Sequence, residues 1–345
     1  MNSKSMQFKA GTIITVGMIL ATFSYYAYQI FFTANLQVDK KETYLYVPTG
    51  ASFETLTDSL NKNEILNDKI SFYFLSKLIG YREKIKPGKY LIKSNMGNLE
   101  ALKMLKRGKQ TPVKLTFNNI RLKKDLAEKI AQKLEIKFEQ LDSVLHNPEY
   151  AQKYGYRSET FGCMFIPNTY EMYWNISLED FFNRMKTEHD KFWNKTRREK
   201  AESMAYSIEQ ITILASIVEA ETNKNDEKSR VAGVYLNRLK INMPLQADPT
   251  VKFAVGDFSI KRIYSGHIAK DSPYNTYKYS GLPPGPINIP SINSIDAVLN
   301  YEKHNYLYFC AHHDLSGHHD FATTYEEHLK IAEKYRKALN KLNIK

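Results

Sequence analysis

The chain has 345 residues, 43% of them hydrophobic and 13% aromatic, which is enough for a full core and two compact domains and excludes a disordered or fibrous protein. Lys and Arg number 49 against 37 Asp and Glu, and the resulting net charge of +12 favours solvated Lys-rich faces over attraction to an anionic polymer or membrane surface. No segment is typical of an RNA-binding or DNA-binding module, so no nucleic-acid partner is expected.

The first expected element is a membrane-spanning helix. No charged residue occurs between Lys9 and Asp39, and residues 10–32 are long enough, at about 1.5 Å per residue, to cross a bilayer of roughly 30 Å. A cleaved signal peptide is the alternative, but it would have a shorter apolar region and a small-residue cleavage site. Residues 1–9 carry lysine and no acid, so the positive-inside rule leaves this tail in the cytoplasm and places the rest of the chain outside it.

Residues 33–44 are expected to form a short charged linker, and residues 45–110 a small domain. The pattern predicts a strand, two helices, a strand after a Pro-Gly turn and a third helix, in that order, over residues 43–50, 52–63, 70–80, 84–94 and 98–109. Ser52 is suited to begin the first helix, and Gly108 to end the last one.

Residues 111–345 are predicted to form a larger α+β domain with elements in irregular order. A strand is expected at 111–117, helices at 123–136, 181–203, 208–223, 229–240 and 326–340, and a hairpin at 306–325. Residues 244–251 and 272–290 are expected to be loops, and the second, rich in Pro and Gly, is long enough to form a functional wall. Cys163 and Cys310 are expected to be buried free thiols, with a disulfide as the alternative.

The helix expected at residues 208–223 carries two glutamates, Glu219 and Glu221, after a strongly apolar run. At about 100° per residue they lie on opposite flanks of a buried stripe, so they cannot meet in one cleft. That stripe is expected to contain Ile211, Leu214, Ala215, Val218 and Thr222. This geometry argues against a glycosidase with two cooperating carboxylates. Glu219 is the better candidate for chemistry because the small and polar neighbours in its row, Thr212, Ser216 and Asn223, leave room for a ligand. The alternative is an ordinary surface carboxylate.

Several motifs occur in an order that resembles the YceG-like endolytic murein transglycosylases, the MltG family. They are FGCMFIPNTYEMYW (161–174), ASIVEAET (215–222), VYLNRL (234–239), PLQADPTV (244–251), YNTY (274–277), GLPPGPI (281–287), YLYFCA (306–311) and HHDFATTYEEH (318–328). The resemblance covers nearly the whole chain, including the anchor and the small domain, which is similar to the LysM-like module of that family. It implies a membrane-anchored lyase that cuts peptidoglycan glycan strands internally, between N-acetylmuramic acid and N-acetylglucosamine, and leaves a 1,6-anhydromuramyl end.

The same resemblance implies roles for individual residues. Glu219 matches the catalytic glutamate of the family, and Glu221 matches a second glutamate with a supporting role. Residues that bind substrate or shape the cleft are implied at Gln246, Asp248, Thr250, Asn275, Thr276, Tyr277, Leu282 and Pro283. The alternative for those in the YNTY motif is that they are ordinary turn or packing residues.

A single carboxyl is sufficient for the implied reaction. Glu219, held near apolar groups, would stay protonated near neutral pH and deliver its proton to the leaving oxygen. Once ionised, it would take the proton of the muramic acid 6-hydroxyl as that oxygen attacks the anomeric carbon. No second carboxylate, metal or cofactor is required.

Residues 312–320 (HHDLSGHHD) are the one segment that suggests a metal site. A hairpin sends alternate side chains to opposite faces, so at most one His pair and one Asp could easily converge. A polar turn between two strands is therefore expected, and no metal.

The resemblance also implies where the protein works. It places the chain in the bacterial inner membrane as a single-pass protein with its catalytic domain outside the cytoplasm, where it limits the length of nascent glycan strands beside the peptidoglycan synthases. Two alternatives stay open: a hydrolytic muramidase, and a non-catalytic membrane-tethered scaffold that binds peptidoglycan.

Overall fold

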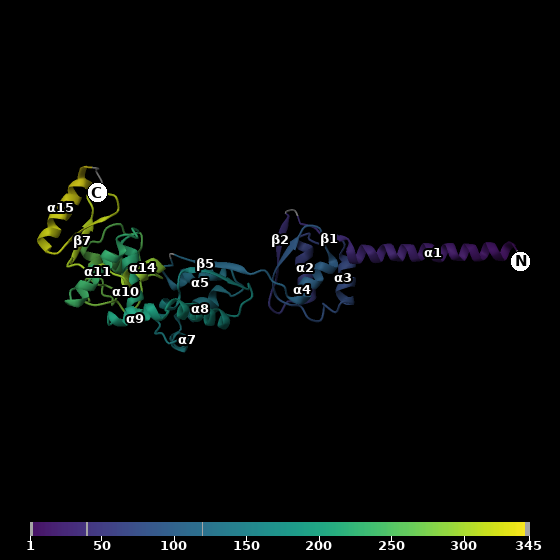
Figure 1. Ribbon diagram of the computed structural model, residues 1–345, viewed down its shortest axis with the longest axis horizontal. Helices are drawn as coiled ribbons and strands as arrows, with labels where there is room; N and C mark the ends of the chain where they lie inside the picture. The colour runs from purple at the N-terminus through teal and green to yellow at the C-terminus, as the bar shows by residue number, and fades with distance from the viewer. Residues whose placement is uncertain (1–2, 39–40, 119, 342–345) are drawn as a thin grey trace. The chain divides into compact units, whose positions relative to one another are not determined.

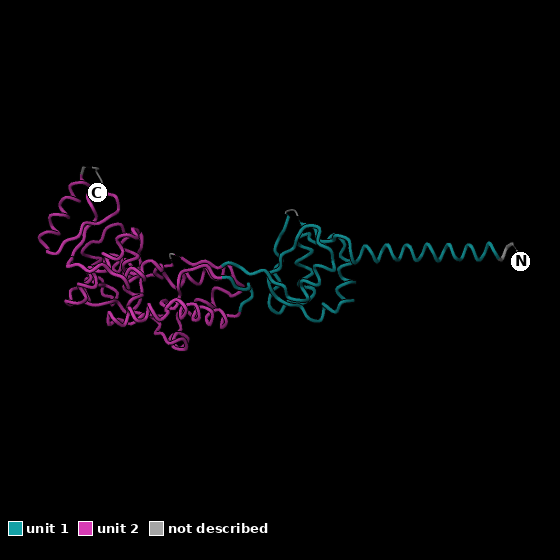
Figure 2. The backbone as a smooth tube through the Cα atoms, in the orientation of Figure 1, with its two compact units in different colours: residues 1–114, 171–176 teal, residues 115–170, 177–345 magenta. Residues whose placement is uncertain are grey.

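The computed structural model describes residues 3–38, 41–118 and 120–341 and combines helices with short paired strands (Figure 1). The predicted α+β class is confirmed. Residues 1–2 of the expected tail and residues 39–40 of the expected linker lie outside the described residues. The chain divides into two compact units, Met1–Lys114 with Glu171–Ile176, and Leu115–Tyr170 with Ser177–Lys345 (Figure 2).

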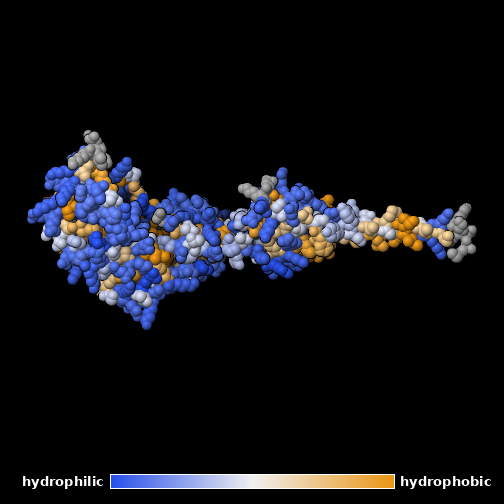
Figure 3. All heavy atoms as spheres, turned by 45° about the horizontal axis from the view of Figure 1, so that its top comes forward, coloured by the Kyte–Doolittle hydropathy of each residue, from blue (hydrophilic) through white to orange (hydrophobic). Residues whose placement is uncertain are grey.

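The amino-terminal helix α1 (Ser3–Phe32) is apolar over most of its length. Its segment Met6–Phe32 is long and apolar enough to cross a membrane, and its most apolar stretch is not buried against the protein. Figure 3 shows these hydrophobic side chains exposed along the helix. A helix that is apolar without a packing partner suits a lipid environment, as expected for a single-pass anchor.

The rest of the first unit is built around an antiparallel strand pair. β2 (Glu42–Val47) pairs with β3 (Gly88–Lys93), and Leu45 and Val47 point into the core. The helices that complete this core are α2 (Phe53–Lys62), α3 (Lys69–Leu78) and α4 (Asn98–Arg107). A second pair, β1 (Ala34–Leu36) with β4 (Met96–Gly97), was not predicted, because strands of two or three residues leave no alternating pattern in the sequence.

The helix ends of this unit follow the expected capping chemistry. Ser52 begins α2 by accepting the backbone N–H of Thr55 across 3.1 Å. Gly108 ends α4 in the left-handed conformation at φ 70°, which only glycine adopts readily. β5 (Val113–Phe117) pairs with β6 (Asn168–Met172), and the division between the two units falls within these strands, slightly beyond the expected boundary at residues 110 and 111.

The second unit has α10 (Ile208–Glu221) at its centre. It packs against α11 (Lys228–Lys240), α12 (Asp248–Val255) and α14 (Ile292–Leu299). The remaining helices are α5 (Lys123–Ala131), α6 (Phe138–His146), α7 (Pro148–Lys153), η1 (Phe161–Met164), α8 (Leu178–Phe192), α9 (Lys195–Ser203), α13 (Ser265–Ile268) and α15 (Tyr325–Lys341). The core around α10 is formed mainly by aliphatic side chains, including Ile211, Leu214, Val218, Val231 and Val298.

Several regions of this unit differ from the expected elements: α6, α7, α13 and α14 were not predicted, the helix expected at residues 123–136 ends at Ala131, and two further differences have identifiable causes. The single helix expected at residues 181–203 is two helices, α8 and α9, because the Asn194 side chain accepts the N–H of Arg197 and begins a new helix. Residues 244–251, expected to be a loop, contain the start of α12, where Pro249 occupies the first turn. In both regions a local helix-start signal, Asn194 or Pro249, lay inside a segment that was expected to be one continuous helix or a loop.

The predicted carboxyl-terminal hairpin is present. β7 (Tyr308–Ala311) pairs with β8 (His319–Ala322) in antiparallel register, and α15 lies against both strands (Figure 1). Both cysteines are free thiols, as expected. Cys163 is buried, whereas Cys310 is only half-buried.

Candidate active site

The helix that carries the two glutamates is buried on all sides rather than along one stripe. α10 begins with a capping box, in which Ser207 and Gln210 each accept the backbone N–H of the other. Every residue from 211 to 218 is buried. Ser216 accepts the N–H of Ile287 across 3.1 Å, so the segment after the proline loop docks on this helix. We expected Thr212 and Ser216, which share a side of the helix with Glu219, to leave room for a ligand. This prediction is wrong, because both residues are buried against the protein.

Glu219 follows this buried run and lines a cavity of about 600 Å³. Small-molecule sites commonly have volumes of roughly 300–1,000 Å³. Its side chain is 23% exposed, so the carboxyl is shielded from bulk water but reachable. The wall comes from α5 and the segment before it, the end of α10 and the residues after it, α12 and the loop after it, and the end of the proline loop: Ile120, Arg121, Asp125, Ala220, Asn223, Pro249, Lys252, Phe258, Ile287, Asn288 and Ile289.

Three side chains hold the Glu219 carboxyl. Lys228, the first residue of α11, donates to Oε2 across 2.9 Å and is itself only 5% exposed. Ser291 and Ser294, at the start of α14, donate to the same oxygen. Burial by itself would raise the pKa of Glu219, but the hydrogen bonds from Ser291, Ser294 and Lys228 outweigh it, and the pKa lies below the ordinary value for glutamate. The prediction that apolar neighbours keep this carboxyl protonated is wrong, because its actual neighbours favour the carboxylate.

Glu221 lies on the other flank of α10, as helical geometry predicts, and has a different partner. The Tyr235 hydroxyl donates to its Oε1 across 2.6 Å. Burial raises the pKa of Glu221 to about 7, although the hydrogen bond from Tyr235 acts in the opposite direction. Glu221 is not among the described residues that line the cavity. The two carboxyls therefore have opposite electrostatic surroundings, and only Glu219 reaches the cavity.

A buried carboxylate connects Lys228 to the carboxyl-terminal hairpin. Glu227 accepts the backbone N–H of His319 at Oε1 across 2.7 Å, and its Oε2 lies 3.1 Å from Nδ1 of the same residue. On the neighbouring strand, the Phe309 ring makes edge contacts with the rings of His319 and Tyr235, at centroid distances of 5.3 Å and 5.8 Å. The hairpin thus supports both Lys228, next to Glu227, and Tyr235, which are the partners of the two glutamates.

Three of the implied substrate-binding residues are fully buried. The Oγ1 atoms of Thr250 and Thr276 lie 2.8 Å apart. Asn275 Nδ2 donates to the carbonyl groups of Ile268 and Lys270 across 2.8 Å and 2.7 Å. Because these side chains are buried and hydrogen-bonded within the protein, they are not available to contact a sugar. The expected role of these three residues is therefore corrected from binding the sugar directly to supporting the backbone around the site. For Asn275 and Thr276 this agrees with the alternative that they are ordinary turn or packing residues.

The other five implied residues range from exposed to buried. Gln246 and Asp248 are exposed, and the Tyr277 hydroxyl donates to Asp248 across 2.6 Å. Leu282 is partly buried and Pro283 is buried. None of these five residues is among the described residues that line the Glu219 cavity. The proline loop therefore approaches the cavity through the residues that follow it.

Sequence reasoning missed four residues of the site: Lys228, Ser291, Ser294 and Asn288. Asn288 lines the cavity and donates to the carbonyl of Ser216 across 2.8 Å, while its Oδ1 has no partner among the described residues. A Ser-x-x-Ser sequence is a signal for a helix start. Nothing in that local pattern indicates that the helix begins beside a glutamate 72 residues earlier in the chain.

A second cavity adjoins the first. Its volume is about 380 Å³, and it shares the lining residues Arg121, Asn288 and Ile289 with the Glu219 cavity. The Arg121 guanidinium lies over the Phe258 ring at 4.3 Å. Two adjoining cavities form a longer recess than one sugar needs, which suits a polymeric ligand.

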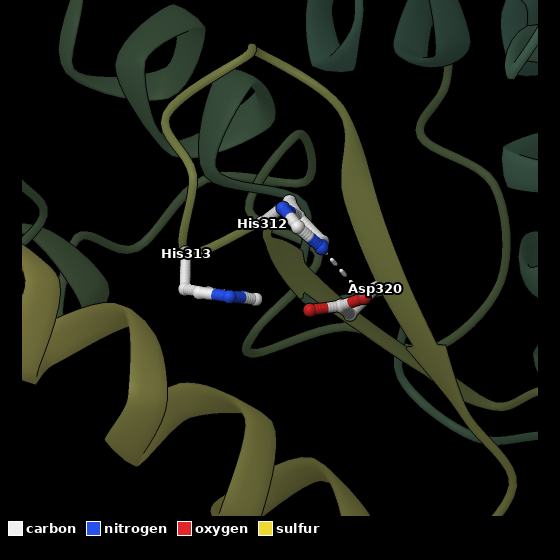
Figure 4. Close-up of side chains that lie close together, drawn as sticks. All are labelled: His312, His313 and Asp320. Atoms are coloured by element: carbon white, nitrogen blue, oxygen red, sulfur yellow. Dashed lines mark ion pairs between the residues drawn. The ribbon is translucent and has the colours of Figure 1, made fainter.

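One His pair and one Asp converge at the hairpin, as the alternation of strands predicts (Figure 4). Donor atoms of His312, His313 and Asp320 all lie within 4.8 Å of one another, and these are the described residues that could hold a metal ion. His312 Nδ1 lies 2.8 Å from Asp314, and its Nε2 lies 3.6 Å from Asp320. Both ring nitrogens of His312 thus already face a carboxylate, which agrees with a polar turn.

Comparison with known proteins gives this arrangement a context. Residues 45–334 match the YceG-like family. An endolytic murein transglycosylase of Bacillus subtilis (strain 168) is 28% identical over 324 residues, which cover 88% of each chain. The protein of the same name from Streptococcus pneumoniae (strain D39) is 27% identical, and the match covers 93% of this chain but 64% of the longer relative.

The fold has a counterpart among solved structures. A YceG-like protein of Listeria monocytogenes, known from a 2.6 Å crystal structure, is similar with a TM-score of 0.57 and 27% identity. The match covers 85% of this chain and 99% of that chain. Since the family match includes the small domain, the glutamate helix and the hairpin, the chain belongs to the YceG-like family.

Proposed function

We propose that this chain is a membrane-anchored lytic transglycosylase that cleaves peptidoglycan glycan strands internally and so limits their length. The observation that carries the proposal is the Glu219 carboxyl, which lines a cavity of about 600 Å³ and is held by one buried cation and two hydroxyl groups. Membership of the YceG-like family supports it, as do relatives named endolytic murein transglycosylase.

In the proposed reaction, protonated Glu219 gives its proton to the oxygen that links N-acetylmuramic acid to N-acetylglucosamine. The bond between that oxygen and the anomeric carbon of muramic acid breaks, and the 6-hydroxyl oxygen of the same sugar attacks this carbon. The Glu219 carboxylate takes the hydroxyl proton, which closes the 1,6-anhydro ring and restores the acid. No water is consumed, so a second carboxylate has no task.

Lys228 and the two serines stabilise the carboxylate form of Glu219, which is the form that accepts the hydroxyl proton. The same contacts lower the fraction of acid at neutral pH, so we expect the rate to rise as the pH falls. Glu221 has the pKa that suits a general acid near neutrality, but its carboxyl faces Tyr235 and not the cavity. Geometry precedes pKa in choosing a catalytic acid, so Glu219 is assigned this role.

Glu227 and His319 act as positioning residues in this proposal. Glu227 is buried and immediately precedes Lys228 in the chain, and its carboxylate is bound by the backbone and ring of His319. A shift of this carboxylate would move the Lys228 ammonium group relative to Glu219. The carboxyl-terminal hairpin therefore contributes to catalysis without touching the substrate.

Substrate contacts are assigned to three polar side chains that lie at or near the surface. Gln246 and Asp248 are exposed and can bind sugar hydroxyl or acetamido groups, and the Tyr277 hydroxyl, which donates to Asp248, can accept a further hydrogen bond. Asn288 lines the Glu219 cavity, but its Oδ1 is buried, so it is assigned a shaping role. Shaping roles are assigned to the residues that are partly or fully buried: Thr250, Asn275, Thr276, Leu282 and Pro283.

We assign a glycan-holding role to the small domain at residues 45–110, as a LysM-like module. Its β2, α2, α3 and β3 follow one another in the order strand, helix, helix, strand. A polar cavity of about 920 Å³ in this unit includes Tyr44 and Tyr46, and exposed aromatic rings are suited to stacking on sugars. The anchor would place the protein in the bacterial inner membrane, with residues 1–9 in the cytoplasm and residues 111–345 outside it as the catalytic domain, beside the peptidoglycan synthases.

Product analysis of Glu219→Gln tests the function. Purified wild type should release fragments with 1,6-anhydromuramyl ends, one water lighter than hydrolysis products, and Glu219→Gln should release none while keeping its circular dichroism spectrum. Glu209→Gln, on the first turn of the same helix, is the matched control and should stay active. Reducing ends from wild type would indicate a muramidase, and binding without products would indicate a scaffold. Equal anhydro products from Glu219→Gln would refute the assignment.

A further inference from the structure

The outward face of α3 is apolar. Ile70, Phe74 and Leu78 are 81%, 54% and 60% exposed. Residues spaced by four lie along one side of a helix, so these three form a continuous apolar stripe. On the other side, Phe72 and Leu75 are fully buried in the core. A surface helix of a soluble domain needs only one apolar face, and the second face marks an interaction surface.

A network of buried amides fixes α3 against the end of α1. Asn98 Nδ2 donates to the carbonyl of Ile30 across 3.3 Å and to Ser71 Oγ across 2.9 Å. Asn98 Oδ1 accepts from Asn35 Nδ2 across 2.7 Å, and Asn35 in turn accepts the N–H of Asp68, which caps α3. These contacts tie the first turn of α3 to the last turn of α1.

Exposed tyrosines indicate where the membrane surface meets α1. Tyr25, Tyr26 and Tyr28 are 61%, 61% and 58% exposed, and tyrosine is enriched at the boundary between lipid and water. Directly after them, Ile30 and Phe31 pack against the core of the first unit. The lipid headgroups therefore lie at the end of α1 against which α3 packs, and Figure 3 shows apolar surface beside this junction.

Charge favours lipid over a protein partner as the occupant of this stripe. Lys69 and Lys77 of α3 are exposed beside it. Lysine side chains extend along apolar surface and keep their ammonium groups at the level of anionic headgroups. An apolar stripe with flanking lysines, next to a membrane-spanning helix, has the composition of an interfacial helix.

We propose that α3 lies in the headgroup region of the membrane that α1 crosses, with Ile70, Phe74 and Leu78 inserted among the lipids. This inference rests on the proposed membrane anchoring by α1. It gives the first unit two attachments to the membrane instead of one, so that the unit is held at a fixed height and orientation on the membrane surface.

Photo-crosslinking of the full chain tests this contact. The protein is reconstituted in vesicles of phosphatidylethanolamine and phosphatidylglycerol with p-benzoylphenylalanine at Phe74. Matched samples carry the probe at Phe23 in α1 and at Tyr46, an exposed aromatic of the same unit on β2. Lipid adducts are measured by mass spectrometry. We expect lipid adducts at Phe74 and Phe23 that exceed those at Tyr46 by about tenfold.

Each other outcome overturns the proposal in a distinguishable way. If Phe23 forms lipid adducts but Phe74 forms no more than Tyr46, α1 is an anchor and α3 does not touch lipid. If Phe74 forms adducts with a second copy of the chain, the stripe is a protein interface. If Phe23 forms none, the anchoring proposal fails and this inference with it, while the product analysis of Glu219→Gln is unaffected.

Discussion

Replacing Lys228 by Met removes the buried cation beside Glu219 while keeping an unbranched side chain of similar length. The Nζ–Oε2 distance is 2.9 Å and the lysine is 5% exposed, so the pair is largely shielded from water. A hydrogen bond to a charged partner contributes about 1.5–3 kcal/mol. Because about 1.4 kcal/mol corresponds to a tenfold change in proton affinity, the affinity of Glu219 for its proton should rise about tenfold to a hundredfold. Ser291 and Ser294 stay in place.

The sign of the effect follows from the lowered pKa of Glu219. The variant keeps the acid form to higher pH, so the pH at which the rate falls should move in the alkaline direction. Folding stability responds as well: a lowered carboxyl pKa stabilises the fold above the ordinary pKa, and this contribution is lost on acidification. Lys228→Met should therefore be less stable than wild type at neutral pH, and the difference should disappear in acid.

The assay is the rate of anhydromuramyl end formation on uncrosslinked glycan strands as a function of pH, together with an infrared titration of the Glu219 carboxyl. Lys240→Met, in the exposed last turn of the same helix, removes the same charge at a distance and serves as the control. If the rate profile and the titration of Lys228→Met coincide with those of wild type and Lys240→Met, the assigned role of Lys228 is refuted.

Further predictions concern the second glutamate, the hairpin and metal ions. Wild type should lose folding stability as the pH rises from about 4.5 to about 7, because in this range Glu221 is still protonated in the folded state but ionised in the unfolded chain. Glu221→Gln should not show this loss, because glutamine does not titrate. Removing this pH-dependent term should therefore raise the free energy of unfolding above about pH 7, measured with denaturant, by about 3 kcal/mol. If the variant keeps the pH dependence of wild type, the burial of Glu221 is contradicted. His319→Ala should lower kcat by up to about a hundredfold with little change in KM. His319→Ala should also shift the pH dependence of the rate in the alkaline direction, as Lys228→Met does. His319→Asn should recover part of the lost rate. The adjacent His318→Ala, whose ring pairs with the exposed Asp226, should match wild type, and equal losses in both would point to general damage of the hairpin. Treatment with EDTA should leave the rate of end formation unchanged, and a loss that zinc restores would instead assign a metal to the hairpin histidines.

Local signals in the sequence predicted much of the fold. Caps and turns are short-range, so Ser52 and Gly108 marked helix ends correctly, and alternation in residues 306–325 indicated the hairpin. Prediction failed where the pattern was too short or was interrupted by a single polar side chain. The two-residue strand β4 left no periodicity, and Asn194 divided a continuous helical pattern into α8 and α9.

The candidate site divides in the same way. Helical periodicity alone separated Glu219 from Glu221 and argued against a mechanism in which these two carboxylates cooperate, since both residues belong to one regular helix. The choice between them, and the protonation of each, depends on groups that are distant in sequence: Ser291 and Ser294 lie on α14, and Tyr235 lies on α11.

The sequence by itself determined the apolar amino-terminal helix, the α+β class, the ends of helices such as α2 and α4 and the position of the candidate glutamate, because each depends on composition or on contacts within a few residues. Only the tertiary structure decided that Lys228, Ser291 and Ser294 hold the Glu219 carboxyl and lower its pKa, that Thr250, Asn275 and Thr276 are buried supports, and that α3 lies beside the end of α1. The physical reason is that burial and hydrogen bonding are set by which distant segments pack together, and a linear pattern does not record that pairing.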